Sequence, residues 1–108
     1  MAFEINWLES AQKELDAEIE FVYCEFGETS ARNAYSNIME FVDNLDMFPK
    51  LGIECKGYMY RGHEVRALHV KQVTIFYSFD EKSQVTILSV WNNYQDPEKV
   101  SEMLGNVS

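Results

Sequence analysis

Three runs of β-branched and aromatic residues fill most of the second half of the chain, at residues 65–70, 73–79 and 85–91. The segments between them, Lys71-Gln72 and residues 80–84, are short and polar, as turns between hairpin strands must be. The pattern predicts a three-stranded antiparallel meander. Both faces of the last two runs are apolar, so period alone does not say which face points to the core. We expect the second face to be covered by the C-terminal segment or by a partner protein.

The first half of the chain begins with alternation and then changes period. Phe3, Ile5 and Trp7 alternate with polar or small residues, which predicts a short, half-buried strand. From about Ser10, the predicted N-cap, apolar residues recur every three or four positions up to Gly27, as in an amphipathic helix. Its apolar stripe comprises Ala11, Leu15, Ile19, Val22, Tyr23 and Phe26.

A second helix follows the turn at Gly27. Thr29 or Ser30 is its predicted N-cap, and the helix is expected to end before Pro49. Its apolar stripe comprises Ala31, Ala34, Tyr35, Ile38, Phe41, Val42 and Leu45. Because one short turn joins the two helices, we expect them to form an antiparallel hairpin.

The resulting order is β-α-α-β-β-β, an α+β fold in which the helical hairpin packs on one face of a small, mostly antiparallel sheet. The chain has 108 residues, and we expect a single domain over residues 1–108. Leu68 and Val70 are predicted to supply part of the sheet side of the core. We expect an irregular or short-stranded connection at residues 53–62 and one or two helical turns at residues 97–104.

The charge of the chain is unevenly distributed. The formal net charge is −9, yet residues 50–71 carry five basic and only two acidic residues. So acidic a chain is not expected to bind nucleic acid broadly, although the basic strip can hold one anionic group or an acidic partner segment. The pairs Glu14/Glu18 and Asp16/Glu20 on the first helix are expected to form a solvated face, with contact to a basic partner as the alternative.

The cysteines and histidines indicate no cofactor chemistry. Cys24 and Cys55 are too few for a disulfide framework and lack zinc-type spacing, which favours a reducing compartment. His63 and His69 lack a third ligand at a useful spacing, so we expect neither a metal nor another cofactor. No signal peptide and no apolar run of membrane-spanning length is recognised, which predicts a cytoplasmic protein.

Across nearly its whole length the chain resembles the RelE/ParE toxin superfamily of bacterial type II toxin-antitoxin modules, also called plasmid stabilisation proteins. The matching positions are Trp7 with Ala11 and Leu15; Ala34; Leu45 with Phe48-Pro49-Lys50-Leu51-Gly52; Arg66-Ala67-Leu68-His69-Val70; Ile75-Phe76-Tyr77; and Ile87-Leu88-Ser89-Val90-Trp91 with Asp96-Pro97. The resemblance implies a toxin that is neutralised by a cognate antitoxin, which adds a helix or strand to cover apolar surface.

The resemblance implies different activities for the branches of the superfamily. Members that cleave messenger RNA on the ribosome carry basic residues where this chain has Val65, Ala67, Thr74 and residues 92–95. The ParE-like branch, which binds DNA gyrase, is more similar in the strand containing Arg66 and in the Asp96-Pro97 ending. We therefore expect a ParE-like toxin. A RelE-type ribonuclease and a non-toxic family member that only binds a partner are the alternatives, and a binding module outside the family is a fourth.

The expected partner-binding residues are Lys56, Arg61, Arg66, His69 and Tyr94. In the ribonuclease alternative these same residues supply a relocated catalytic set, with Arg66 and Tyr94 as the catalytic candidates. Each also has a structural interpretation. Arg66 can pin a loop or a carboxylate at the end of the sheet, and Tyr94 can cap the sheet as an aromatic side chain.

Overall fold

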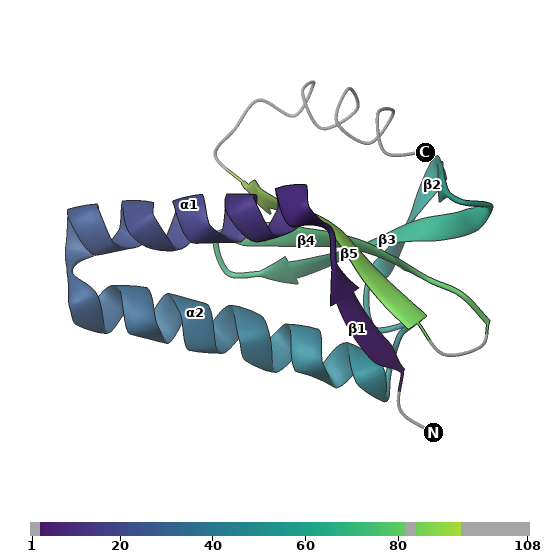
Figure 1. The fold of residues 1–108 in the computed structure, drawn as a ribbon, viewed down its shortest axis with the longest axis horizontal. Coiled ribbons are helices and arrows are strands. Elements are labelled where there is room, and N and C mark those ends of the chain that lie inside the picture. Colours follow the sequence, from purple (N-terminus) through teal and green to yellow (C-terminus); the bar gives the residue numbers. More distant parts are fainter. Residues whose placement is uncertain (1–2, 82–83, 94–108) are drawn as a thin grey trace.

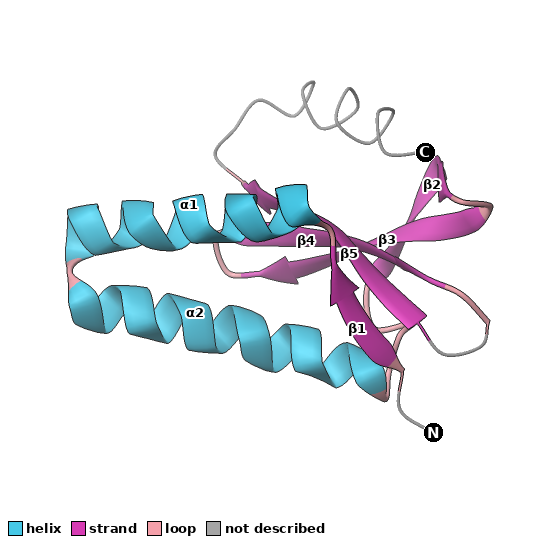
Figure 2. Cartoon of the chain, viewed as in Figure 1, coloured by secondary structure: helices cyan, strands magenta, loops and turns pink. Residues whose placement is uncertain are grey.

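A helical hairpin and a five-stranded sheet make up the part of the chain that the computed structural model describes, residues 3–81 and 84–93 (Figures 1 and 2). The elements are β1 (Glu4–Trp7), α1 (Glu9–Phe26), α2 (Glu28–Asp43), a 3-10 turn (Asn44–Asp46), β2 (Ile53–Tyr60), β3 (His63–Val70), β4 (Val73–Phe79) and β5 (Gln84–Asn92). The sheet order is β1-β5-β4-β3-β2, with β1 parallel to β5 and the other neighbours antiparallel. The predicted α+β class and antiparallel helical hairpin are confirmed.

Strand β2 is the main difference from the predicted order, which becomes β-α-α-β-β-β-β. The segment expected to be irregular or short-stranded pairs with β3 at Ile53 and Glu54 and again at Met59 and Tyr60, with a register shift between the two pairs. This shift, with Gly57 inside it, breaks the alternation that marks a strand in the sequence. The strand forms because its neighbour β3 offers an edge of unpaired backbone groups.

The start of helix α1 is set by the pairing of the preceding residues with β5. The N–H of Leu8 donates to the carbonyl of Ile87 at 3.0 Å, so pairing with β5 holds the chain extended up to Leu8. Leu8 is therefore the N-cap residue, and no side chain caps the helix. The prediction of Ser10 as the cap is wrong, because Ser10 lies inside the first helical turn.

One glycine ends α1 and starts α2. Gly27 has φ of +94°, a conformation that side chains disfavour, and its N–H donates to the carbonyl of Tyr23 while its own carbonyl accepts from Ala31. Thr29 and Ser30 lie inside α2, so the prediction that one of them caps it is wrong. A reversal through a single residue leaves no room for a separate capping segment.

The core lies between the helical hairpin and one face of the sheet. Leu68 and Val70 belong to it, as predicted. The buried members of this cluster are Ala11, Leu15, Ile38, Val42, Leu45, Leu68, Val70, Val73, Ile75, Tyr77, Val85, Ile87 and Val90. The register of β5 shifts between Phe76 and Tyr77 of β4, which is why Ile87 and Val90 both face the helices although three positions separate them.

The other face of the sheet carries a second buried cluster of Val65, Ala67, Phe76 and Leu88. Partly buried side chains packed against it are Leu8, Cys55, Tyr58, Tyr60 and Trp91. Strand β2 therefore supplies three of the residues that pack against the second face, a role that the sequence pattern had suggested for the C-terminal segment or a partner. The predicted helical turns at residues 97–104 lie outside the described residues.

The hairpin is longer than the sheet that it covers. Figure 2 shows the turn between α1 and α2 projecting beyond the end of the sheet marked by the β3–β4 turn. Tyr23 and Phe26 near this turn, although part of the predicted apolar stripe, are consequently exposed. Tyr35 and Phe41 of the α2 stripe are exposed as well, although Phe41 lies near the other end of the hairpin. The periodicity identified the helix correctly, whereas the sheet determines how much of its stripe is buried.

Candidate functional site

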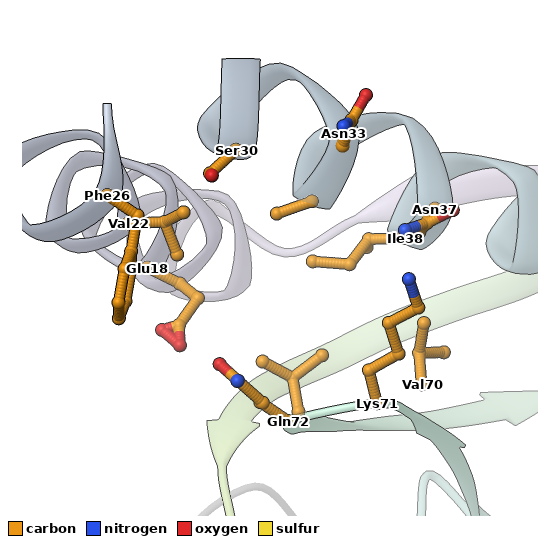
Figure 3. Close-up of a pocket in the computed structure, with 12 residues that line it drawn as sticks. Glu18, Val22, Phe26, Ser30, Asn33, Asn37, Ile38, Val70, Lys71 and Gln72 are labelled. Carbon is orange, nitrogen blue, oxygen red and sulfur yellow. The ribbon is translucent and has the colours of Figure 1, made fainter. Parts of the chain in front are cut away.

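A groove of about 330 Å³ lies between the outer halves of α1 and α2 and the β3–β4 turn (Figure 3). Apolar side chains from the helices and the sheet line it: Val22, Phe26, Ala34, Ile38, Val70 and Val73. Polar side chains complete the lining: Glu18, Ser30, Asn33, Asn37, Lys71 and Gln72. The groove exists because the hairpin continues past the sheet, so the facing apolar stripes of the helices are only partly filled by β3 and β4.

Glu18 extends from α1 toward the β3–β4 turn (Figure 3). Its carboxylate accepts from the side-chain amide of Asn92, with N–O distances of 3.0 and 3.4 Å. Burial raises the pKa of Glu18 above its ordinary value, and the Asn92 hydrogen bond only partly offsets this. No ion pair is formed by Glu18 among residues 3–81 and 84–93.

Lys71 reaches into the same groove from the β3–β4 turn (Figure 3). Its backbone has φ of +55°, which this two-residue hairpin turn requires. The turn is held to the end of β5, because the carbonyls of Lys71 and Gln72 accept from the side chain and backbone of Asn93 at 3.3 and 2.9 Å. Over the described part of the chain, Lys71 also forms no ion pair.

Glu14 covers the edge of β5 beyond the end of β1. One carboxylate oxygen accepts from the Ser89 hydroxyl at 2.9 Å and from the Val90 N–H at 3.2 Å. The prediction of a solvated face is therefore wrong for Glu14 and Glu18, although Asp16 and Glu20 are exposed as expected. A carboxylate here replaces the missing strand partner of β5.

The opposite end of the molecule is held by buried polar contacts. The Tyr77 hydroxyl accepts from the Gly52 N–H and donates to the Pro49 carbonyl, both at 2.7 Å. A Cβ on Gly52 would lie 2.8 Å from the Ala67 carbonyl oxygen, so only glycine fits between the turn and the sheet. The turn at residues 49–52 is thus clamped to β3 and β4.

Arg66 belongs to the same clamp. Its guanidinium donates to the Gly52 carbonyl at 2.7 Å, pairs with Glu64 at 2.8 Å and lies over the Phe79 ring. The side chain is only 15% exposed. These contacts match the interpretation of Arg66 as a residue that pins a loop and a carboxylate at the end of the sheet.

The other candidate residues are dispersed. Lys56 lies on the edge strand β2, and Arg61 occupies the β2–β3 turn with its guanidinium 5.4 Å from the Tyr60 ring centroid. Arg61 and Lys71 flank the eight residues of β3, so they are about 25 Å apart and the basic strip forms no single patch. Tyr94 lies outside the described residues.

His69 faces the side of the sheet opposite the helices, since it alternates with Leu68 and Val70. Its Nδ1 lies 2.9 Å from the Thr74 hydroxyl, which itself donates to the side-chain carbonyl of Asn93 at 2.6 Å. Because the Thr74 hydroxyl donates to Asn93, its oxygen is available to accept a hydrogen bond from the His69 ring. His63 and His69 lie near opposite ends of β3.

The described part of the chain holds no group of three His, Cys, Asp or Glu side chains positioned to share a metal ion. Neither of its two helices is both long and apolar enough to cross a membrane.

The sequence interpretation missed Glu18 and Lys71 as a pair facing one groove. A signal was present on α1, because Ala11, Glu14, Glu18 and Val22 follow one another at three- or four-residue intervals and therefore share a face. The position of Lys71 opposite that face depends on the tertiary packing of the β3–β4 turn.

Comparisons with known proteins agree with this architecture. A family model described as "ParE toxin of type II toxin-antitoxin system, parDE" matches residues 5–97. A solved structure described as "Chromosomal ParDE TA system from P. aeruginosa" superposes with a TM-score of 0.68 at 22% sequence identity, covering 84% of this chain and 96% of the other. At that identity the likeness establishes a shared fold. No curated protein matches the chain significantly.

Proposed function

The chain belongs to the ParE toxin family of type II toxin-antitoxin systems, and from this premise we propose that it inhibits DNA gyrase in the cytoplasm and is neutralised by a cognate antitoxin. Both activities are protein–protein contacts. Neither requires a catalytic group or a cofactor from this chain.

The amount of exposed apolar surface is the observation that carries the proposal. Ten large apolar side chains of the described residues are at least 40% exposed, more than scattered surface positions normally provide. Seven of them lie in two regions at opposite ends of the hairpin. Near its tip lie Phe21, Tyr23 and Phe26, and beyond the end of α2 lie Met47, Phe48, Leu51 and Ile53. Two separate regions suit a protein that binds two partners.

The groove next to the hairpin tip is the proposed site for the antitoxin. A groove with an apolar floor, walled by two helices and a hairpin turn, suits a helical or extended peptide segment. For the gyrase contact we propose the second apolar region, with Lys56, Arg61, His69 and Tyr94 as separate contact residues rather than one basic patch. Arg66 serves this surface indirectly, by holding the turn at residues 49–52.

The ribonuclease alternative gains no support from the position of Arg66. Its guanidinium already contacts a backbone carbonyl, a carboxylate and an aromatic ring, which leaves little of it to stabilise a cleaving phosphodiester. A non-toxic family member would keep the antitoxin groove and lose the gyrase contact.

The test is induced expression of the chain in a bacterial host, with growth, plasmid supercoiling and bulk translation followed together. We expect growth arrest with loss of negative supercoiling, and inhibition of purified gyrase in a supercoiling assay. The double variant Lys56→Glu/Arg61→Glu should abolish both effects. Lys13→Glu is the control, since Lys13 lies on α1 and pairs with Glu9 of the same helix.

Other outcomes would contradict the proposal in different ways. Arrest in which translation stops before supercoiling changes would support the ribonuclease alternative. Growth without arrest, at a verified level of folded protein, would support the non-toxic alternative. Arrest that the adjacent antitoxin gene fails to relieve would contradict neutralisation.

A further inference from the structure

The groove at the hairpin tip presents two opposite charges across an apolar floor. Glu18 lies on one wall and Lys71 on the other, and each reaches into the groove (Figure 3). They do not pair with each other, nor with any other charged group in the described part of the chain. The Glu18 carboxylate is partly desolvated and accepts a hydrogen bond from the Asn92 amide, so it is stabilised further when a cation approaches it.

The surroundings of the groove are strongly acidic. The two helices carry nine acidic and two basic residues. Both basic residues form ion pairs within their own helices, Lys13 with Glu9 at 3.3 Å and Arg32 with Glu28 at 2.7 Å. Lys71 is the one basic side chain among the residues that line the groove. The electrostatic potential there therefore attracts a positively charged segment and repels a negatively charged one.

We propose that this groove binds a net-cationic, amphipathic segment of the antitoxin, with Lys or Arg facing Glu18, an apolar side chain on the floor and a carboxylate facing Lys71. The inference rests on the proposed neutralisation by an antitoxin and specifies its chemistry. Charge complementarity identifies the occupant, because a net-acidic segment would face the acidic helices with one lysine to balance them.

Glu18 also indicates the path of the segment beyond the groove. It lines a second hollow of about 420 Å³ between α1 and the end of β5, together with Glu14, Phe21 and Trp91. Glu18 thus lines both hollows. A basic side chain placed there is within reach of both, and the apolar residues that follow it in the segment can pack against Phe21 and Trp91.

The experiment measures the affinity of the full chain for the antitoxin encoded beside its gene, by isothermal titration calorimetry at low and high salt. Glu18→Gln keeps an oxygen acceptor for Asn92 and removes the charge. We expect it to weaken binding about 10-fold, and Lys71→Gln to weaken it about 3-fold. The control is Glu20→Gln, an exposed residue of the same helix outside the groove, which should change affinity less than about 2-fold.

Two results would overturn the inference while leaving neutralisation intact. One is wild-type binding that Glu18→Gln and Glu20→Gln alter equally. The other is a segment, cross-linked to the groove and sequenced, that carries more Asp and Glu than Lys and Arg. Failure of the antitoxin to bind the wild-type chain at all would overturn the proposed neutralisation as well. Thermal unfolding of each variant confirms that it is folded.

Discussion

Polar side chains at the two ends of the helical hairpin differ in whether they have partners within the chain. At the end near β1, Tyr77 and Arg66 satisfy the backbone groups of the turn at residues 49–52. At the tip, Glu18 and Lys71 face a groove without a charged partner among the described residues. The contacts of Tyr77 and Arg66 stabilise the folded state of the isolated chain. The charges of Glu18 and Lys71 remain available to interact with another molecule. We therefore expect substitutions at the end near β1 to affect mainly stability, and substitutions at the tip to affect mainly binding.

The largest expected effect is at the clamped end. Tyr77→Phe leaves the Gly52 N–H and the Pro49 carbonyl without their partner in a buried site, which should lower the free energy of unfolding by about 2–4 kcal/mol. Urea-induced unfolding of the wild type and the variant measures this difference in the free energy of unfolding. Tyr23→Phe, on an exposed tyrosine, is the control and should have almost no effect. Equal stability of the two variants would mean that the clamp contributes nothing.

Arg66→Met should lower the free energy of unfolding by about 1–2 kcal/mol, because it removes the hydrogen bond to Gly52 and leaves Glu64 without its cation. Water still reaches Glu64, which limits the loss. Arg32→Met is the matched control, since its ion pair with Glu28 is exposed and worth less than about 0.5 kcal/mol. A folded Arg66→Met protein that unfolds like the wild type but no longer inhibits gyrase would identify Arg66 as a contact residue instead.

Two phenylalanines of similar exposure sharpen the comparison between the ends. Phe26 at the tip is 65% exposed and Phe48 beyond α2 is 63% exposed. Replacing either by alanine should change the free energy of unfolding by less than about 0.5 kcal/mol. Only Phe26→Ala removes a side chain that lines the groove, so it alone should weaken antitoxin binding, by about 10-fold. If Phe48→Ala weakens binding equally, the antitoxin contacts both ends.

The smallest expected effect on stability is at Glu18, where substitution should stabilise the protein rather than destabilise it. Burial holds the pKa of Glu18 above its ordinary value of 4.5, so the folded chain binds this proton more tightly than the unfolded chain. Stability from this group is therefore greatest below the ordinary pKa and falls as pH rises through the raised pKa. Glu18→Gln should remove that decline and raise stability at neutral pH by a few tenths of a kcal/mol, since water still reaches the carboxylate.

Unfolding of wild type and Glu18→Gln between pH 4 and pH 8 measures the difference. A variant that is less stable than the wild type at neutral pH would show that the Asn92 contact outweighs desolvation. Glu18 would then resemble Tyr77 rather than a residue reserved for binding.

Most of the fold was predictable because it follows from local periodicity. The alternation in β1 and the apolar runs of β3, β4 and β5 are written into consecutive residues, as are the three- and four-residue intervals of the helices. Strand β2 was expected only as an irregular or short-stranded connection, because its pairing depends on the edge that β3 offers rather than on its own pattern. The helix starts were misplaced for a similar reason, since pairing with Ile87 and the reversal at Gly27 outweigh the intrinsic capping preference of Ser10, Thr29 and Ser30.

The sequence by itself therefore determined the class of fold, the family resemblance and the basic and aromatic residues from which contacts can be built. Only the tertiary structure decided how they are used. It joined Arg66 to Gly52 across 14 positions and Glu14 to Ser89 across 75 positions, and it placed Glu18 opposite Lys71. Periodicity assigns a residue to a face of its own helix or strand, but the groups that meet that face are chosen by the packing of distant segments.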